Sequence, residues 1–589
     1  MCHSMKVFID LMWYFKQEKW RYGGGIAILA IVSVLSLLPP YIVGVIVDHI
    51  SMETLTEEIL WQWMLILFGL AITVYVFRYI WRILIFGSAI RLARLLRNQL
   101  YGHFSKMTSS FFQKRRTGDL MAHATNDIRA VEQTAGAGVL TLVDSLTMGG
   151  FVILTMAVTI SWELTLIALI PMPFMALATS KYGAMLHKRF SKAQAAFSSL
   201  NDKVQESMSG VKVIKTFGYE KEDADSFRKE SDNVVNKNIE VAKVDALFDP
   251  TISLIVGFSF FLSIVFGSMF VVAGDITIGQ LTSFTVYLGL LIWPMLAFGW
   301  LFNIVERGRA SYDRISSLLA VKQEIVDEPD ADQNPPEGEI TFRIGRFSYE
   351  QEEAPALQNI NLHISRGETL GIAGRTGSGK TTLVRSLMRD FDIDEGTILF
   401  KQKPIHRYTL DALRTTVGYV PQDHFLFSAT IADNISFAKP DASYAEIMEA
   451  ARLAAIHDDI LQFDDGYETV VGERGVTLSG GQKQRISIAR ALLADPEVLV
   501  LDDSLSAVDA KTEEQILHHL RELRAGKTTF ITAHRLSAIK HADQIAVMDN
   551  GTISEHGTHE ELMANNRWYR KMYDHQQLES LVKKGGEPS

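Results

Sequence analysis

Residues 374–381 read G-R-T-G-S-G-K-T, and residues 478–482, far downstream, read L-S-G-G-Q. The first stretch has the form G-x-x-x-x-G-K-[ST], whose glycines let backbone N–H groups turn toward phosphate oxygens. The helix that follows adds the positive end of its dipole to the same site. In this pattern Lys380 reaches the β- and γ-phosphates and Thr381 holds Mg²⁺. Taken alone, the octapeptide indicates only a site for nucleotide phosphates.

The sequence on either side supports this interpretation. An apolar, strand-like run from Glu368 to Ala373 precedes the loop, and residues 381–388 have a helical pattern. Strand, glycine-rich turn and helix form the context that a phosphate-binding loop needs. The predicted phosphate-binding residues are Gly374, Arg375, Thr376, Gly377, Ser378, Gly379, Lys380, Thr381 and Thr382.

The two motifs together resemble those of the ATP-binding-cassette (ABC) proteins, and the resemblance covers the whole chain. It implies ATP as the nucleotide and a second subunit as a partner. In that family the L-S-G-G-Q signature completes the nucleotide site of the opposite subunit. The resemblance therefore gives a nucleotide-binding role to Leu478, Ser479, Gly480, Gly481 and Gln482.

Further nucleotide-site residues follow from the pattern and the resemblance. The apolar run 498–501 is typical of a strand buried on both faces, and Asp502 at its end is placed to hold Mg²⁺. Gln422, in V-P-Q-D, resembles the family's metal- and water-contacting glutamine, although a polar turn residue after Pro421 would look the same.

His534 follows the apolar run 530–533 and resembles the switch histidine that contacts the γ-phosphate; a surface histidine is the alternative. Tyr349, in R-F-S-Y, resembles the aromatic residue that stacks on adenine, and a core tyrosine is the alternative. Residues 506–509 (S-A-V-D) resemble the D-loop, which touches the opposite subunit.

One position departs from the family pattern. Asp503 stands where the family normally has a catalytic Glu that polarises the attacking water. Aspartate is shorter by one C–C bond, about 1.5 Å. Misplacement of a catalytic group by about 1 Å can reduce the rate on the order of a hundredfold. The chain is therefore expected to bind ATP and to hydrolyse it poorly at its own site, unless Asp503 still serves as a slow base.

Composition indicates a chain that is part membrane protein and part soluble protein. Of its 589 residues 47% are hydrophobic and 21% are charged, and the long apolar runs lie in the first half. The net charge of -10, with no basic domain, argues against a nucleic-acid partner. A single cysteine, Cys2, excludes a disulfide framework. No cleaved signal peptide is expected.

The apolar runs predict transmembrane helices of about 20 residues each. They lie near 24–47, 61–83, 137–160, 164–182, 252–273 and 281–303, and Pro39-Pro40 is expected to kink the first. The short connections (48–60, 161–163 and 274–280) contain no Lys or Arg, whereas the long ones (84–136 and 183–251) are rich in both. The positive-inside rule then predicts a multi-pass plasma-membrane protein with both termini and the ATP domain in the cytoplasm.

The long connections have a helical pattern, so the spanning helices are expected to continue beyond the membrane. Within them, residues 117–122 and 209–217 resemble the turns that carry the two coupling helices of ABC exporters, although local chemistry alone favours ordinary helix turns. The acidic, Pro-rich stretch 324–338 is predicted to be a linker. The expected domains are a transmembrane domain (1–323), this linker, and an ATP-binding cassette (339–589).

Substrate contacts are less clearly marked. Asp144 in the third span and Arg78 in the second are ionisable residues at membrane depth, which are functional candidates by default. Asp144 fits either a substrate cavity or a structural ion pair, and Arg78 fits an interfacial position as well. The sixth span is rich in large side chains that adapt to apolar ligands or pack in the membrane: Phe284, Tyr287, Trp293, Met295, Phe298, Trp300 and Phe302.

The fold class expected from the resemblance is an α-helical domain with six transmembrane helices, fused to an α/β P-loop nucleotide-binding domain. The run L-D-D-S-L-S-A-V-D resembles the BmrC-type subunits of heterodimeric multidrug exporters, whose partner bears the catalytic Glu. The implied activity is ATP-driven export of lipophilic small molecules across a lipid bilayer. The alternatives are a homodimeric lipid or peptide exporter and a membrane-tethered ATP sensor that transports nothing.

Overall fold

The computed structural model describes residues 5–349, 354–472 and 477–585, and the chain divides into two compact units. The first unit comprises Met1–Ser105 and Arg116–Lys322, and the second comprises Lys106–Arg115 and Gln323–Ser589.

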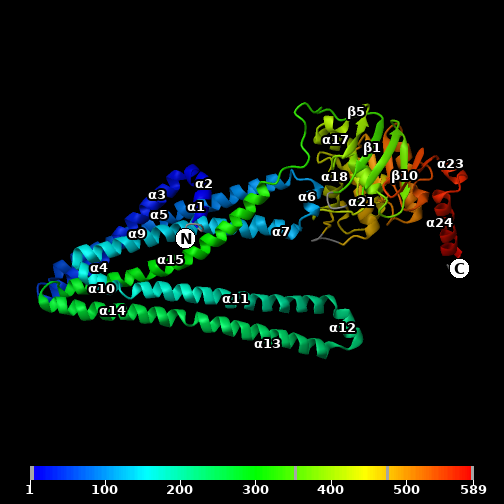
Figure 1. Ribbon diagram of the computed structural model, residues 1–589. Coiled ribbons are helices and arrows are strands. Elements are labelled where there is room, and N and C mark those ends of the chain that lie inside the picture. The colour runs from blue at the N-terminus through cyan, green and yellow to red at the C-terminus, as the bar shows by residue number, and fades with distance from the viewer. Residues whose placement is uncertain (1–4, 350–353, 473–476, 586–589) are drawn as a thin grey trace. The chain divides into compact units, whose positions relative to one another are not determined.

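The described part of the first unit is helical throughout (Figure 1). Three one-turn π-helical segments interrupt its third long stretch: η1 (His123–Asp127), η2 (Thr134–Gly138) and η3 (Met156–Ile160). Its α-helices are α1 (Lys6–Asp10), α2 (Met12–Gln17), α3 (Lys19–Leu35), α4 (Leu38–Ser51), α5 (Glu57–Phe104), α7 (Thr117–Ala122), α8 (Ile128–Gln133), α9 (Val139–Thr155), α10 (Trp162–Leu169), α11 (Met172–Ser209), α12 (Val211–Phe217), α13 (Glu220–Asp245), α14 (Phe248–Ala273) and α15 (Ile278–Leu319).

Six helical stretches of the described chain are long and apolar enough to cross a membrane, which confirms the predicted number of spans. They are Lys19–Ser51, Glu57–Phe104, Thr117–Ile160, Trp162–Ser209, Glu220–Ala273 and Ile278–Leu319. The shortest has 33 residues and the longest 54. Because about 20 residues suffice to span a bilayer, each stretch extends well past the apolar core, as the helical pattern of the connections predicts.

Three of these stretches break just before a helix that has proline in its first turn. The first breaks at Ser36–Leu37, and Pro39 lies in the first turn of α4, where a missing N–H disturbs no helical hydrogen bond. This break confirms the kink expected at Pro39-Pro40. The fourth stretch breaks between α10 and α11, at Ile170–Pro171, and the fifth between α13 and α14, at Ala246–Leu247, with Pro250 in the first turn of α14. Neither break was predicted.

Helices α4 and α15 meet at two glycines. A Cβ atom on Gly279 would lie 2.0 Å from the carbonyl oxygen of Gly44, so only glycine permits this approach. Beside it, the Asp48 carboxylate accepts hydrogen bonds from the Thr277 hydroxyl and the Gly279 N–H, both at 2.7 Å. These bonds fix α4 to the start of α15. At the other end of the unit, α11 and α13 run side by side and α12 joins them (Figure 1).

The second unit contains two sheets. A four-stranded antiparallel sheet has the order β2-β1-β4-β5, and a six-stranded sheet has the order β10-β9-β3-β8-β7-β6. In the larger sheet only the β10–β9 pair is antiparallel. The strands are β1 (Ile340–Phe347), β2 (Leu357–Ile364), β3 (Thr369–Gly374), β4 (Glu395–Phe400), β5 (Lys403–Pro404), β6 (Val417–Val420), β7 (Val498–Asp502), β8 (Thr528–Thr532), β9 (Gln544–Asp549) and β10 (Thr552–Gly557).

Two apolar clusters cover the faces of the larger sheet. Val498 and Val500 of β7 belong to one cluster, and Leu499 and Leu501 belong to the other. All five residues of β7 are buried, as the continuous apolar run predicts. The α-helices of this unit are α16 (Lys380–Ser386), α17 (Leu410–Thr416), α18 (Ile431–Ser436), α19 (Tyr444–Leu453), α20 (His457–Ile460), α21 (Gly480–Leu493), α22 (Ala510–Leu523), α23 (His559–Ala564) and α24 (Trp568–Gly585).

One short helix far from the cassette in sequence belongs to the second unit. Helix α6 (Ser109–Gln113) lies between α5 and α7 in the chain, and the preceding Thr108 hydroxyl donates to the Glu324 carboxylate at 2.8 Å. Lys114 forms an ion pair with the same carboxylate. Residues 117–122, which resemble a turn that carries a coupling helix, form α7, whereas α6 was not predicted. Residues 209–217 contain α12 as a separate short helix.

Candidate nucleotide site

Four parallel strands deliver the predicted nucleotide residues to one edge of the larger sheet. Strand β3 runs into the 374–379 loop, β7 ends at Asp502, and β8 leads to His534. Strand β6 leads to Gln422. Because the carboxyl ends of parallel strands meet at one edge, residues that are far apart in sequence become neighbours there.

Glycine is required at both ends of the 374–379 loop. Gly374 has φ +147°, and a Cβ atom there would lie 2.4 Å from the Met548 carbonyl oxygen. Gly379 has φ +99°, and its Cβ would lie 2.7 Å from the Ala356 carbonyl oxygen. The loop is therefore held against the ends of neighbouring strands in a conformation that other residues would strain.

The side chains after the loop have the chemistry that a phosphate group needs. Lys380 is 7% exposed, and its ammonium donates to the carbonyl oxygens of Gly374 and Arg375, both at 2.9 Å. Burial lowers the pKa of Lys380, and the carboxylates of Asp503 and Asp502 act in the opposite direction. The buried Ser378 hydroxyl has no hydrogen-bond partner among the described residues. An unpaired buried donor in this loop fits an anionic ligand.

Asp502 lies at the centre of a hydrogen-bond network and is 1% exposed. Its Oδ1 accepts from the hydroxyls of Thr381 at 3.1 Å and Thr532 at 2.7 Å. Its Oδ2 accepts from the Tyr419 hydroxyl at 2.8 Å. Thr381 and Asp502, two of the three predicted magnesium ligands, are thus in direct contact, and their oxygens suit a hard cation.

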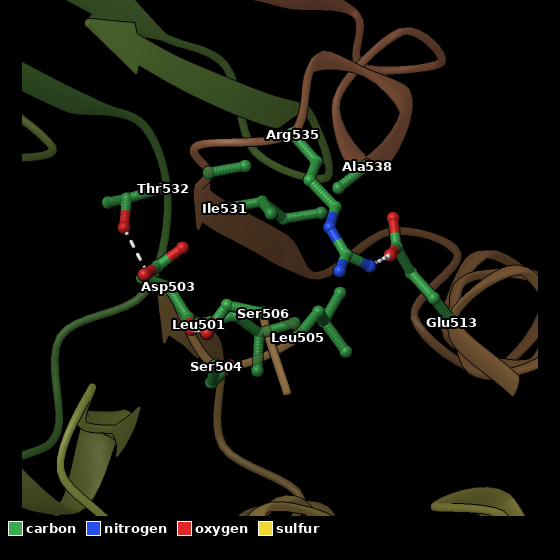
Figure 2. Close-up of a pocket in the computed structure, with 11 residues that line it drawn as sticks. Leu501, Asp503, Ser504, Leu505, Ser506, Glu513, Ile531, Thr532, Arg535 and Ala538 are labelled. Atoms are coloured by element: carbon green, nitrogen blue, oxygen red, sulfur yellow. Dashed lines mark hydrogen bonds and ion pairs between the residues drawn. The ribbon is translucent and has the colours of Figure 1, made fainter. Parts of the chain in front are cut away.

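Asp503 turns away from the strand in a left-handed conformation, with φ 49°. Its backbone N–H donates to the Thr532 hydroxyl at 2.9 Å, and Figure 2 shows the two residues side by side. The Gln422 amide approaches its carboxylate, with Nε2 3.4 Å from Oδ2. Burial raises the pKa of Asp503, and His534 and Lys380 oppose that shift. A raised pKa suits a general base.

These side chains line a single cavity of about 550 Å³, within the range of small-molecule sites. The predicted site residues that line it are Tyr349, Thr376, Gly377, Ser378, Gly379, Lys380, Thr381, Thr382, Gln422, Asp502, Asp503 and His534. Tyr349 lines this cavity, and its hydroxyl is 3.1 Å from that of Thr382. Its ring contacts Phe347 and Phe391 edge-on, so it is also part of an aromatic cluster.

The L-S-G-G-Q residues lie elsewhere, at the start of α21. Ser479 caps this helix: its hydroxyl accepts from the Gln482 N–H at 3.3 Å, and the Gln482 side chain accepts from the Ser479 N–H at 3.0 Å. Leu478 is buried and anchors the turn, whereas Ser479 and Gly480 are exposed. An exposed helix N-terminus with a serine cap can receive an anion from outside this cassette.

Two residues of the network were not predicted from the sequence. Thr532 bonds both Asp502 and the Asp503 backbone, and Tyr419 bonds Asp502 from β6. Tyr419 was detectable as a hydroxyl-bearing residue in the otherwise apolar strand that leads to Gln422. Nothing in the sequence distinguishes Thr532 from other strand threonines.

In the membrane unit the structure bears on the substrate candidates. Asp144 on α9 is half-buried, and the charge of Arg78 on α5 acts on it. Among the described residues, however, no ion pair joins the two. Phe284 and Tyr287 of α15 are buried in the helix core, and the Tyr287 hydroxyl donates to the Leu37 carbonyl at 2.7 Å.

Other large residues of the sixth span remain accessible. Trp293 is 65% exposed and Trp300 is 54% exposed in the isolated chain. The side chain of Phe298 lies outside the described residues.

The described part of the chain contains no group of three or more His, Cys, Asp or Glu side chains that would hold a metal ion without other ligands.

Comparison with known families gives two matches along the chain. Residues 23–295 match the ABC transporter transmembrane region, and residues 357–506 match the ABC transporter ATP-binding family model. The multidrug resistance-like ATP-binding protein MdlA of Escherichia coli (strain K12) is 49% identical over 578 residues, which are 98% of either chain.

Two further relatives and one solved structure match nearly the whole chain. A probable multidrug resistance ABC transporter ATP-binding/permease protein, YheI of Bacillus subtilis (strain 168), is 48% identical over 97% of this chain and 98% of its own length. The ATP-dependent lipid A-core flippase of Syntrophus aciditrophicus (strain SB) is 32% identical over 98% of this chain and 96% of its own. The solved structure of a bacterial Atm1-family ABC exporter with ATP bound superposes with a TM-score of 0.77 at 25% identity, covering 95% of this chain and 98% of that one.

Proposed function

Because the chain belongs to the ABC transporter family, with the exporter fold and an ATP-hydrolysing domain, we propose that it is one half of a heterodimeric exporter of lipophilic drugs or similar amphiphiles. The observation that carries the heterodimer proposal is Asp503, at the position after the metal-binding aspartate in an otherwise complete nucleotide cavity. The multidrug-resistance names of two relatives that match nearly the whole chain support the substrate class.

The cassette residues then have these roles. The 374–382 segment binds the ATP phosphates, and Tyr349 stacks on the adenine in the cavity. Thr381, Asp502 and Gln422 would hold Mg²⁺, which neutralises charge on the phosphates. Gln422 and His534 orient the attacking water and the γ-phosphate respectively.

Asp503 makes this site a weak one. Its carboxylate ends one C–C bond, about 1.5 Å, short of where a glutamate would place it. The Gln422 amide nitrogen lies 3.4 Å from this carboxylate. A water that Gln422 orients would be farther from the carboxylate of Asp503 than from that of a glutamate at this position. We expect ATP to remain bound here for longer than at a glutamate-bearing site.

The signature of this chain serves the other site. In the proposed dimer the exposed N-terminus of α21, with Ser479 as its cap, donates to the γ-phosphate held by the partner's phosphate loop. The partner supplies the catalytic Glu there. One chain thus binds ATP in its own weak site and completes the strong site of its partner.

The membrane unit moves the substrate. The predicted orientation, with both termini and the cassette in the cytoplasm of a plasma-membrane protein, follows from the Lys and Arg distribution of the connections. Asp144 is the proposed contact for cationic substrates, because a carboxylate in a medium of low dielectric attracts a cation strongly. Trp293 and Trp300 offer accessible aromatic surface on α15.

A homodimeric lipid exporter is the second candidate, and the similarity to a lipid A-core flippase favours it. A membrane ATP sensor that transports nothing is the third. Purification of the tagged chain from its native host separates the first two assemblies, because a heterodimer yields two different half-transporters in equal amounts.

Transport assays separate the functions. The purified complex in vesicles is expected to move a fluorescent lipophilic cation when ATP is added, and Lys380→Ala in this chain, paired with the equivalent change in the partner, is the matched inactive control. Movement of a labelled lipid without movement of the cation would favour the flippase, and ATP hydrolysis without either would favour the sensor.

A further inference from the structure

The last described helix of the chain touches the loop that carries His534. The side-chain amide of Gln576, on α24, donates from Nε2 to the His534 carbonyl oxygen at 2.8 Å. The same amide accepts from the Leu536 N–H through Oε1 at 2.9 Å. One side chain therefore satisfies a backbone acceptor and a backbone donor that flank Arg535.

Helix α24 is well anchored where this contact forms. Tyr569 is fully buried, and its hydroxyl lies 2.9 Å from the His559 ring nitrogen. The Glu555 carboxylate accepts from the Trp568 N–H at 2.8 Å. Positions 569, 573 and 576 fall on one face of a helix, because residues three, four and seven apart share a face. The buried tyrosine thus aims Gln576 at the loop.

The loop is held at other points as well: Leu536 is buried, and the Arg535 carbonyl accepts from the Ala538 N–H at 3.2 Å. His534 and Arg535 are exposed, and Arg535 is extended, with φ -92° and ψ 117°. An extended segment at the end of a strand has no helical hydrogen bonds of its own. The two bonds from Gln576 add direct contacts to the His534 carbonyl and the Leu536 N–H, and so help to fix the backbone from which the imidazole extends.

The opposite side of the loop is tied to the D-loop. The Arg535 guanidinium donates to the Val508 carbonyl at 3.2 Å and to the Glu513 carboxylate at 3.3 Å. Figure 2 shows the Arg535 and Glu513 side chains in direct contact, and both line a small cavity that Asp503 also lines. The hydrogen bonds of Gln576 and those of the Arg535 guanidinium thus both hold the loop in place.

We propose that Gln576 is a positioning residue for His534. The docking of α24 then sets how strongly this chain's own site prefers ATP, which has a γ-phosphate, over ADP. The inference rests on the proposed contact of His534 with the γ-phosphate. It predicts that loss of the Gln576 amide weakens ATP binding and leaves ADP binding unchanged, since ADP has no γ-phosphate.

The test is the ratio of ATP to ADP affinity at this chain's own site, measured on the full complex with Mg²⁺. Radiolabelled 8-azido-ADP is photo-crosslinked to this chain, and ATP or ADP competes for it. Gln576→Met keeps the length and the helix propensity of the side chain and removes both hydrogen bonds. His575→Met, on the neighbouring exposed position, is the matched control.

Gln576→Met is expected to lower the ATP:ADP preference roughly 5- to 30-fold, the effect of losing one to two kcal/mol from two neutral hydrogen bonds. Gln576→Glu keeps an acceptor for Leu536 and lacks the donor to His534, so it should fall between wild type and Gln576→Met. His575→Met should leave the preference unchanged. In a His534→Ala background, Gln576→Met should change nothing further.

Amide hydrogen exchange gives a readout that does not depend on nucleotide. The Leu536 N–H should exchange faster in Gln576→Met and at the wild-type rate in His575→Met. If His534→Ala leaves the ATP:ADP preference unchanged, the proposed role of His534 is wrong. If His534→Ala lowers the preference and Gln576→Met does not, or if Gln576→Met weakens ATP and ADP equally, the role of His534 stands and the positioning role of Gln576 is overturned.

Discussion

Replacement of Asp503 by glutamate should strengthen the weak site of this chain. The substitution extends the carboxylate by about 1.5 Å, one C–C bond. A shift of about 1 Å can change a rate on the order of a hundredfold. Asp503 has φ 49°, a conformation that aspartate tolerates better than most residues, so part of the gain will be lost to backbone strain. We expect Asp503→Glu to raise hydrolysis at this site by roughly 10- to 100-fold.

The assay must report ATP hydrolysis at this chain's own site without the faster hydrolysis at the partner's site. Ser479→Arg in this chain places bulk and charge at the N-terminus of α21, which should silence the partner's site and leave the site of this chain intact. Steady-state ATPase of the purified pair is then compared between Ser479→Arg alone and Ser479→Arg with Asp503→Glu. The second is expected to recover most of the activity that the first loses.

Two results would refute this reasoning. No recovery at saturating Mg-ATP, with ATP binding intact, would mean that the reach of the carboxylate is not what limits the site. In a homodimer Ser479→Arg would disable both sites at once, and Asp503→Glu would restore nothing; a complex containing only this chain would identify that case.

Three further substitutions test separate parts of the account. Tyr349→Ala should weaken ATP binding at this chain's own site by roughly 1–3 kcal/mol, the scale of base–aromatic stacking, and should affect nucleotides without a purine much less. If ATP binding in the photo-crosslinking assay is unchanged, Tyr349 only packs in the aromatic cluster with Phe347 and Phe391. Asp144→Asn should reduce drug-stimulated ATPase more than basal ATPase, whereas equal loss of both with poor expression would indicate a structural role. Tyr419→Phe removes one hydrogen bond from the buried Asp502 carboxylate. It should raise the Mg²⁺ concentration for half-maximal ATP binding about 10- to 100-fold. An unchanged Mg²⁺ dependence would exclude a role of Tyr419 in orienting Asp502 for the metal.

The sequence predicts most of the architecture because membrane helices and phosphate loops have strong local signals. The apolar runs mark all six spans, and the strand before Gly374 and the buried run 498–501 appear in the structure as β3 and β7. The boundaries are less predictable, because the π-helical segments depend on how neighbouring helices pack, which no local pattern records. The break at Ile170–Pro171 has a local cause, since Pro171 and Pro173 lie at the start of α11.

Contacts between distant segments limit what the sequence can reveal about the site. Thr532 and Tyr419 join Asp502 only because β6, β7 and β8 are adjacent in the sheet. Gln576 reaches the His534 loop because a buried tyrosine two turns earlier orients α24. In the membrane unit, Phe284 and Tyr287 looked like ligand contacts as much as Trp293 did, and only burial separates the packing residues from the accessible ones.

The most direct test of the asymmetric dimer compares Ser479→Arg with Asp503→Asn, each carried separately by this chain in the purified pair. The quantity measured is steady-state ATPase at saturating Mg-ATP. If Ser479 serves the strong site and Asp503 the weak one, Ser479→Arg should nearly abolish turnover and Asp503→Asn should reduce it far less. Should Asp503→Asn prove as damaging as Ser479→Arg, Asp503 is a working base and the weak-site account is wrong.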